Sequence, residues 1–385
     1  MQTSVPSALT NASALPPVRI DDAASEFRPV VLPKNGFLIE RNQGLGDLIM
    51  LLSVLRGLQR MGYYVCLLCD APYIPFMTTQ GIDLVLDIDE RPWPESRLIA
   101  DLRRKVDYPQ ETDDFATVHR TLLFARALKA VTSVEVPLDE PAPHLKVPAA
   151  AEPWAVENRP KEPYAVAQMR ASSNPRSYPH MYEVCRRLQR HLPVIAIHHE
   201  PVPLPPGVID HCGHTSVANV AALIAGASVV VAPDSSGVHL AGGYGVPFVA
   251  LFGPTLASTR LDYYQHFRVL RSRPQCEPCH EQRHCVQDWN TPSPCLSEVP
   301  PEHVVQAANH KGRNVLVGVH DPGPPVGVIG KSGGVAQRIH CRHDTSQRLG
   351  LRGRYISGRV RDRDSPARRV VCIAGTAPER VGDLG

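Results

Sequence analysis

The sequence predicts an α/β fold in which two parallel-sheet domains, each covered by helices, face each other across a cleft. Three observations support this prediction. Short uncharged runs such as ASVVVA and PFVALF alternate with amphipathic stretches, and this alternation is typical of parallel sheets with helices on their faces. The alternation occurs twice, on either side of a proline-rich stretch. A chain of 385 residues is also long enough for two domains with sizeable cores.

Both sets of elements are expected to begin with a strand. The first set comprises a strand at 37–40, a glycine loop at 42–47, a helix at 48–61, strands at 63–70 and 82–89, and a helix at 115–131. The second set has strands at 164–169, 193–198, 227–232 and 247–252, helices at 179–192 and 216–227, and a short helix from Gly237. Because helices separate most of these strands, neighbouring strands are expected to run parallel.

Proline content and composition indicate the domain boundaries. Proline removes an amide donor and interrupts helices and central strands, and it is dense between Val136 and Pro163. We expect a flexible leader (1–33), an N-terminal domain (34–140), a proline-rich linker (141–163), a C-terminal domain (164–310) and a Gly/Arg-rich tail (311–385).

The distribution of charge argues against a nucleic-acid partner. The net charge is +3, but residues 311–385 hold 14 of the 41 Lys and Arg and 6 of the 38 Asp and Glu, so the remainder is mildly acidic. A protein body that binds nucleic acid would be expected to carry a basic surface. The chain also has no apolar run near the roughly 20 residues of a membrane helix and no signal-peptide pattern. We therefore expect a cytoplasmic protein without a transmembrane segment.

The tail at 311–385 is expected to be disordered. It is rich in Gly, Pro and Arg, contains no Phe, Trp or Met, and has no sustained helical or strand periodicity. Such a segment buries too little apolar surface to offset the entropy lost on ordering. A folded or phosphate-binding tail is the alternative, and we assign the tail no function.

The first glycine loop, NQGLGD, carries a candidate catalytic residue. Gly44 and Gly46 permit a tight turn into a helix whose first amides and positive dipole end point toward the cleft. Asp47 lies at this helix start. The carboxylate is interpreted either as a helix cap or as a general base that takes a proton from an acceptor hydroxyl.

A dinucleotide-binding loop is an alternative for the same residues. Gly44-x-Gly46 matches the start of the GxGxxG fingerprint, and Asp70 ends the next strand, where a ribose-binding acid would lie. The third glycine is missing, because Ile49 occupies its place. NAD binding is therefore not expected.

The second loop, APDSSGVHLAGGYG, follows a buried strand and has the composition of an anion site. Ser235 or Ser236 is placed to cap a short helix from Gly237, and a helix start flanked by hydroxyls suits a diphosphate. His239 is either a structural residue or a donor to a phosphate oxygen. Asp234 ends the strand, and its carboxylate can accept from a pair of sugar hydroxyls.

Three segments together resemble a known family. They are GLGDLIMLLSVLRGL in the first half, the stretch from GHTSVANV to LFGPT in the second half, and CEPCHEQRHC with CLSEVPPEHVVQA after it. This combination resembles glycosyltransferase family 9, the lipopolysaccharide heptosyltransferase family, over roughly residues 34–309. The resemblance implies two Rossmann-like domains in the GT-B arrangement, with an acceptor-side N-terminal domain and a C-terminal domain that binds the nucleotide sugar.

The resemblance also implies a reaction. The expected enzyme is an inverting, metal-independent glycosyltransferase of lipopolysaccharide biosynthesis. It would move a sugar, with heptose as the best-known example, from a nucleotide-diphosphate donor to a glycan or lipid-linked glycan acceptor, and it is compatible with a peripheral place at the membrane. A non-catalytic sugar-nucleotide or glycan-binding protein and a sugar-nucleotide epimerase are the alternatives on the same fold.

Individual roles follow from the same resemblance. Asp47 becomes the catalytic base, and the donor site comprises Arg176, Asp234, Ser235, Ser236, Gly237 and His239. NPRSYPHMY is similar to the family's Lys-x-Trp-Pro element, so Arg176 takes the place of the phosphate-contacting Lys, with Tyr178 for Trp and Pro179 for Pro. Arginine keeps the positive charge and adds a planar fork suited to phosphate. Ser236 stands where the family usually has Gly, which would narrow access to the diphosphate.

Four cysteines form a candidate structural metal site. Cys276 and Cys279 have the CxxC spacing of a ligand pair, and Cys285 and Cys295 follow in a loop-like stretch. The second pair is more widely spaced than in familiar zinc knuckles. A structural zinc and metal-free cysteines that brace the loop both remain open, and no metal is expected to take part in catalysis.

Two shorter patterns are interpreted as structural. Cys66 and Cys69 form a CxxC within an expected strand, where a separation of three places the side chains on opposite faces. Asp87 and Asp89 match the Asp-x-Asp metal motif of the other main transferase architecture. A three-residue pattern carries little weight, and these acids are expected in a loop at the end of a strand.

Overall fold

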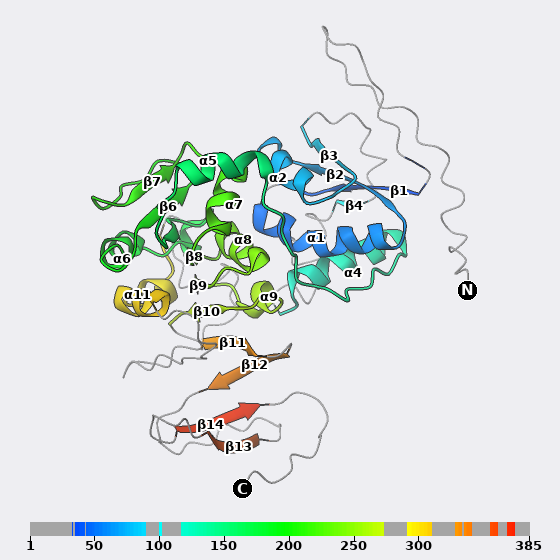
Figure 1. The fold of residues 1–385 in the computed structure, drawn as a ribbon. Helices are drawn as coiled ribbons and strands as arrows, with labels where there is room; N and C mark the ends of the chain where they lie inside the picture. Colours follow the sequence, from blue (N-terminus) through cyan, green and yellow to red (C-terminus); the bar gives the residue numbers. More distant parts are fainter. Residues whose placement is uncertain are drawn as a thin grey trace.

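The computed structural model describes residues 33, 35–42, 44–89, 100–101, 117–272 and 291–309, together with strands at 328–332, 335–340, 355–360 and 368–373. Figure 1 shows two α/β domains side by side and, below them, a separate antiparallel sheet. The two α/β domains agree with the architecture that the sequence predicts.

The first domain is built on a parallel sheet with the strand order β3-β2-β1-β4. Its strands are β1 (Gly36–Glu40), β2 (Tyr64–Cys69), β3 (Leu84–Asp87) and β4 (Ala100–Asp101), and its helices are α1 (Leu45–Arg60), α2 (Ile74–Thr79) and α4 (Arg120–Thr132), with a 3-10 turn, η2, at Ala71–Tyr73. The sequence does not predict α2 or β4, because segments of six and two residues are too short to give a periodic signal.

The second domain has a six-stranded sheet in the order β10-β9-β8-β5-β6-β7, with all neighbours parallel. Its strands are β5 (Ala165–Gln168), β6 (Val194–His198), β7 (Ile209–Cys212), β8 (Val229–Pro233), β9 (Phe248–Leu251) and β10 (Phe267–Leu270). Its helices are α6 (Met181–Leu188), α7 (Val217–Ala225), α8 (Ser236–Tyr244), α9 (Ser258–Leu261), α10 (Pro294–Ser297) and α11 (Pro301–Asn309), and η6 is a 3-10 turn at Asn174–Arg176.

The strand orders place a switch point in each sheet. In the first sheet the chain proceeds outward from β1 to β3 on one side, and β4 pairs on the other side of β1. In the second sheet β5 leads to β6 and β7, whereas β8 on its other side leads to β9 and β10. Ligands of open α/β sheets bind outside the carboxyl ends of strands at such points. The loops after β1, β5 and β8 are therefore the places to look for a site.

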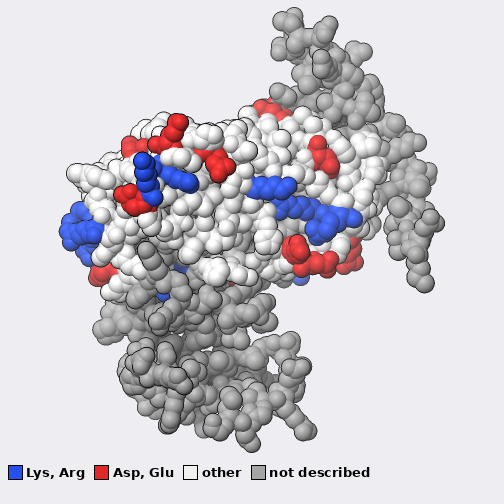
Figure 2. Space-filling model, in the orientation of Figure 1, with Lys and Arg blue, Asp and Glu red and all other residues white. Residues whose placement is uncertain are grey.

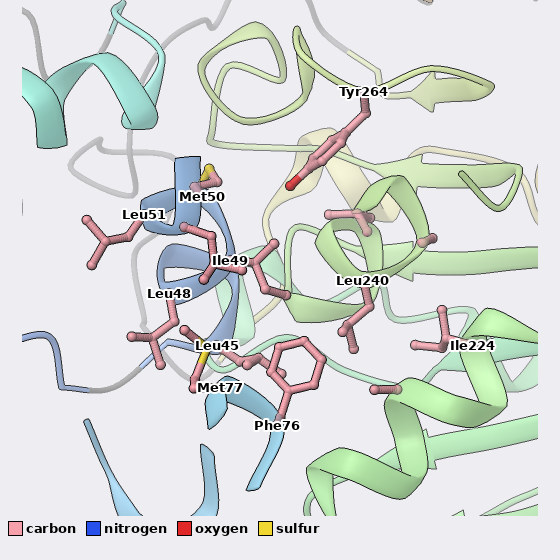
Figure 3. Close-up of a cluster of buried hydrophobic side chains, with 14 of the residues drawn as sticks. Leu45, Leu48, Ile49, Met50, Leu51, Phe76, Met77, Ile224, Leu240 and Tyr264 are labelled. Atoms are coloured by element: carbon pink, nitrogen blue, oxygen red, sulfur yellow. The ribbon is translucent and has the colours of Figure 1, made fainter. Parts of the chain in front are cut away.

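One hydrophobic cluster runs through both domains. It joins buried side chains of α1 and α2 to those of α7 and α8. In Figure 3, Leu45 and Phe76 from the first domain lie beside Leu240 and Ile224 from the second. Helix α1 contacts α4 in its own domain and α8 across the boundary. This position explains why α1 is apolar on almost all sides, since a helix covered all round has no face left for solvent.

The proline-rich segment is bound to both domains. The Pro141 carbonyl accepts a hydrogen bond from the Ser53 hydroxyl of α1 at 2.8 Å. The Leu145 amide donates to the Gly243 carbonyl of α8 at 3.0 Å. The segment continues through a 3-10 turn, η5 (Ala149–Ala151), into α5 (Glu152–Glu157), which packs on α7. These contacts fix the connection against the same pair of helices that meet at the domain boundary.

Four strands within the tail belong to the described residues. Four strands, β11 (Val328–Ser332), β12 (Val335–His340), β13 (Tyr355–Val360) and β14 (Arg368–Ile373), form an antiparallel sheet in the order β11-β12-β14-β13. All four contain β-branched residues, as in VAQRIH and RRVVCI, and these favour extended backbone. The remaining residues of 311–385 lie outside the described part.

The Cys66/Cys69 and Asp87/Asp89 patterns both have the structural roles that the sequence predicts. Cys66 packs with Leu38 and Leu68 on one face of β2, whereas Cys69 belongs to the large cluster on the other face. Burial raises the pKa of both thiols to about 12, so they are core residues. After β3, the Asp89 amide donates to the Asp87 carboxylate at 3.0 Å in a strand-end turn.

The surface carries no dominant charge on the face that Figure 2 shows. Basic and acidic side chains of the described residues form small separate groups there, with a large uncharged area between them. Among the described helices, none has both the length and the hydropathy required to cross a membrane.

Candidate active site

The start of α1 holds Asp47 between two arginines. The loop from β1 passes through Gly44, whose φ of 77° lies in the left-handed region that glycine adopts without strain. The Asp47 carboxylate forms an ion pair with Arg41, directly after β1, and its Oδ1 lies 3.5 Å from Nε of Arg120 at the start of α4. Among the described residues, its ion-pair partners are these arginines.

The electrostatic surroundings keep Asp47 ionised. Burial raises the pKa of its carboxyl group, but the positive charges of Arg41, Arg120 and Arg260, with His239, hold that pKa well below its usual range. The side chain keeps 19% of its surface exposed. Asp47 is therefore a carboxylate at neutral pH that solvent or a ligand can reach.

Asp234 lies at the carboxyl end of β8 in a similar setting. It is 4% exposed, and its carboxylate accepts a hydrogen bond from Thr255. Arg176 Nη1 donates to the Asp234 carbonyl at 3.1 Å and lies 3.8 Å from the carboxylate Oδ2. Burial raises the pKa of Asp234, and Arg176 and Arg260 lower it to a greater extent. This aspartate is also ionised.

The start of α8 is held by a side chain that the sequence analysis missed. Ser235 is the N-cap residue, but its side chain makes no capping hydrogen bond, so the predicted cap by this residue is wrong. Instead, Gln168 Nε2 donates to the Ser235 hydroxyl at 2.7 Å, and Gln168 Oε1 accepts from the Gly237 amide at 2.8 Å. Gln168 is the last residue of β5. A polar residue at the end of the apolar run YAVAQ is the sequence signal from which it could have been predicted. Ser236 is half-buried in the first turn of α8.

His239 connects the two loops. Its Nδ1 lies 3.0 Å from the Tyr264 hydroxyl. The ring also packs against the first turn of α1, because a Cβ added to Gly46 would stand 2.5 Å from His239 Cδ2. Burial lowers the pKa of His239 to about 4, although Asp234 and Asp47 oppose that shift. The histidine is therefore neutral at neutral pH, and Gly46 is required where the domains touch.

Arg260 lies within electrostatic reach of both aspartates. This buried residue of α9 donates from Nη1 to the carbonyl and hydroxyl oxygens of Thr259, at 3.2 and 3.0 Å. Burial and the nearby Arg120 lower its pKa to about 10, while Asp234 and Asp47 raise it, so it stays charged at neutral pH. We call Asp47, Asp234, His239, Arg176 and Arg260 the interdomain site.

Other predicted residues lie elsewhere. Tyr178 is buried and donates from its hydroxyl to the Val299 carbonyl at 2.7 Å. Cys276, Cys279 and Cys285 lie outside the described residues. Cys295 is buried, and its Sγ lies 3.2 Å from the Ser293 hydroxyl.

One group of metal-ligating residue types occurs among the described residues. His198, His199 and Glu200 bring ligand atoms within 4.8 Å of one another at the carboxyl end of β6. Both His199 and Glu200 are exposed. The group is separate in sequence from the interdomain site, and we assign it no ion.

Sequence comparison decides the family. The profile of Glycosyltransferase family 9 (heptosyltransferase) matches residues 74–290. The chain belongs to glycosyltransferase family 9. It is therefore a glycosyltransferase enzyme, as its resemblance to that family implies. The comparison with curated protein sequences found no match.

Solved structures of the family share its fold. An ADP-heptose lipopolysaccharide heptosyltransferase II from E. coli aligns with a TM-score of 0.54 at 16% identity, over 71% of this chain and 97% of that one. A glycosyl transferase family 9 protein from Veillonella parvula gives 0.52 and 14%, over 71% and 95%. The iron-containing dodecameric glycosyltransferase TibC of enterotoxigenic E. coli gives 0.53 and 16%, over 74% and 79%. The GT-B arrangement of this family 9 chain follows from these matches.

Proposed function

We propose that this family 9 enzyme is an inverting, metal-independent transferase that moves a sugar from a nucleoside diphosphate to an acceptor hydroxyl. One observation carries the proposal: Asp47 and Asp234 come from different domains, yet both act on the same Arg260 and the same His239. A group that deprotonates an acceptor and a group that holds a donor need this proximity, because reacting atoms must be held about 3 to 3.5 Å apart.

Asp47 serves as the general base. It is ionised at neutral pH, partly exposed and located at the amino end of α1. Its low pKa makes it a weak base while Arg41 and Arg120 contact it, since basicity falls with pKa. The acceptor hydroxyl therefore has to displace at least part of this arginine contact before its proton passes to Asp47 and its oxygen attacks the anomeric carbon.

The C-terminal domain stabilises the leaving diphosphate. In a single displacement the bond from the anomeric carbon to the diphosphate oxygen breaks as the new bond forms, so the configuration inverts. Negative charge then grows on the diphosphate. His239, the guanidinium groups of Arg176 and Arg260 and the positive dipole end of α8 are fixed positive or donor groups near that position, and such preorganised groups stabilise developing charge. This set supplies the charge without a divalent ion.

The donor is a nucleotide sugar, with heptose as the first candidate. Heptosyltransferase II is described as an ADP-heptose enzyme, and TibC is described in complex with ADP-D-β-D-heptose. Asp234 accepts from hydroxyls of the donor sugar. The acceptor is a glycan or a lipid-linked glycan such as a lipopolysaccharide core, and the enzyme works in the cytoplasm or at the inner face of a membrane.

A panel of ligands tests this proposal. Thermal-shift measurements with ADP, GDP, UDP and TDP and their sugar conjugates should identify one preferred nucleotide, because a bound ligand raises stability by RT ln(1 + [L]/Kd). The preferred sugar nucleotide is then incubated with candidate acceptors, and the anomeric configuration of the product is read by NMR. Retention of configuration, or donor binding without turnover on any acceptor, would contradict the proposal. Product formed without an acceptor would indicate an epimerase.

Metal content is tested separately. The transfer rate should stay within about twofold after dialysis against EDTA, because the charge on the leaving group is met by side chains and the α8 dipole. Mass spectrometry of the purified protein should include iron as well as zinc, since TibC is described as iron-containing. A metal retained at the cysteines without effect on the rate would be structural. Loss of transfer on EDTA treatment, with recovery on adding the metal back, would refute metal independence.

A further inference from the structure

Among the described residues, His239 makes one side-chain hydrogen bond, and its partner is a fully enclosed tyrosine. The His239 Nδ1 and the Tyr264 hydroxyl are 3.0 Å apart. Tyr264 is 2% exposed, and Figure 3 shows its hydroxyl turned toward α1. Within the described part of the chain, His239 is the only hydrogen-bond partner of that hydroxyl.

The burial of both groups fixes the direction of this hydrogen bond. Burial raises the pKa of Tyr264 far above its ordinary value and lowers the pKa of His239 to about 4. A neutral phenol therefore faces a neutral imidazole at neutral pH. If Nδ1 carried the proton, the buried phenol proton would have no acceptor among the described residues, which is costly. The Tyr264 O–H donates to Nδ1, and the ring proton consequently sits on Nε2.

The Nε2 edge of the ring faces the boundary between the domains. A Cβ added to Gly46 would lie 3.1 Å from His239 Nε2, so this nitrogen is directed toward the glycine loop. The charged groups that act on the ring are Asp234, Asp47, Arg260 and Arg120. The hydrogen bond of the ring to a described residue is at Nδ1, and Nε2 makes none. An N–H directed into a candidate ligand site and not bonded to the protein is available to a ligand.

We propose that Tyr264 is a positioning residue that holds His239 as the Nε2–H tautomer, so that Nε2–H donates to the diphosphate oxygen released from the sugar. The inference rests on the proposed function and deepens it. In this tautomer the Nδ1 lone pair is occupied by Tyr264 and Nε2 carries hydrogen. His239 then has no lone pair for an acceptor hydroxyl and cannot compete with Asp47 as the base. The proton remains on Nε2 throughout, and only a hydrogen bond is gained.

The tautomer can be observed without any activity. Long-range ¹H–¹⁵N NMR of the full-length protein at neutral pH distinguishes protonated from unprotonated ring nitrogens, and the His239→Gln variant assigns the signal. We expect an unprotonated Nδ1 and a protonated Nε2 in the natural protein, and a mixture of tautomers in Tyr264→Phe. The matched control is Tyr164→Phe, which removes another buried hydroxyl of the same domain, bonded to the Leu223 carbonyl. It should leave the His239 signals unchanged.

Kinetics test whether the tautomer matters for transfer. With the nucleotide sugar identified by the panel, Tyr264→Phe should lower kcat about tenfold with a smaller change in donor KM, a size typical of one lost hydrogen bond. A glutamine at position 239 places an amide N–H near the position of Nε2 whatever residue 264 is. In the His239→Gln background, Tyr264→Phe should therefore change kcat less than twofold, roughly.

The outcomes separate this inference from the proposed function. A proton on His239 Nδ1 in the natural protein would overturn the role of Tyr264, whatever the activity. If the tautomer is as expected but Tyr264→Phe lowers kcat equally in the natural protein and in the His239→Gln variant, the hydroxyl is merely structural. That result would also overturn the role of Tyr264. If the tautomer is as expected but transfer proceeds with retention of configuration, or no transfer occurs at all, only the proposed function is refuted.

Discussion

Arg41 and Asp47 form an ion pair across the loop that joins β1 to α1. The ion pair occupies part of the Asp47 carboxylate, because the Arg41 guanidinium contacts the group to which we assign the acceptor proton. Arg41 is 3% exposed at its side chain and lies over the ring of Phe124, so it is held in place from behind. The Asp47 carboxylate is therefore restrained by this arginine.

Asp47→Asn should abolish transfer and preserve donor binding. Removal of a general base costs typically about 100- to 10,000-fold in rate, whereas the donor groups lie in the other domain. The rate is measured with saturating donor, and the nucleoside diphosphate affinity by calorimetry. Asp83→Asn is the matched control, because Asp83 accepts from Gln59 and the Val65 amide away from the site. A variant that retains more than about a tenth of the rate would exclude Asp47 as the base.

Arg41→Gln should move the acid limb of the pH–rate profile to higher pH. In the natural protein, Arg41 is the first of the positive charges that lower the pKa of Asp47 against the effect of burial. Without Arg41 the carboxylate takes up a proton at higher pH, and kcat/KM falls earlier on acidification. The natural enzyme should show no loss from Asp47 between about pH 5 and 8, well above its pKa. The control is Arg56→Gln. Arg56 lies on α1, the helix that carries Asp47, and donates to backbone carbonyls, so this variant should leave the pH–rate profile unchanged.

Gly46→Ala should weaken the contact between the domains. The added Cβ would stand 2.5 Å from His239 Cδ2, so the ring or the helix must shift, and overpacking of this kind costs about 1 to 3 kcal/mol. We expect a lower urea midpoint and a fall in kcat of about tenfold or more, since the catalytic groups on the two sides move apart. In Gly62→Ala the new Cβ meets nothing within 4 Å, but the φ of 87° strains any side chain, so the urea midpoint should fall while activity persists. Unchanged kinetics in Gly46→Ala would mean that the loops are not apposed during catalysis.

The stability of the protein should depend on His239 between about pH 4 and 6.5. Its folded pKa, about 4, lies below the ordinary value of 6.5, so the unfolded state binds more protons in this window and stability rises with pH. The full effect is about 3 kcal/mol, at 1.36 kcal/mol for each pKa unit. His239→Gln should flatten the pH dependence of the free energy of unfolding. His198→Gln is the comparison, because the pKa of the half-buried His198 is also lowered to about 4.

The fold and most residues of the interdomain site are accessible from sequence for physical reasons. Buried parallel strands read as short apolar runs, and ligand groups gather where such runs end, which is how Asp47, Asp234 and His239 are found. Gln168 follows the same rule and could have been included. Three further residues could not have been predicted, because they come from helix starts and turns far along the chain: Arg120, Arg260 and Tyr264. Only the packing of α4 and α9 against the domain boundary brings them to the aspartates.

The hydrophobic cluster that passes from α1 and α2 into α7 and α8 has a consequence for how the enzyme must be handled. Neither half of the chain covers its own apolar surface, so each domain expressed separately would present an exposed patch to water and tend to aggregate. Heating the intact chain should melt both parallel sheets in a single cooperative transition, and a truncation meant to isolate the C-terminal domain would remove the partner that covers its apolar surface.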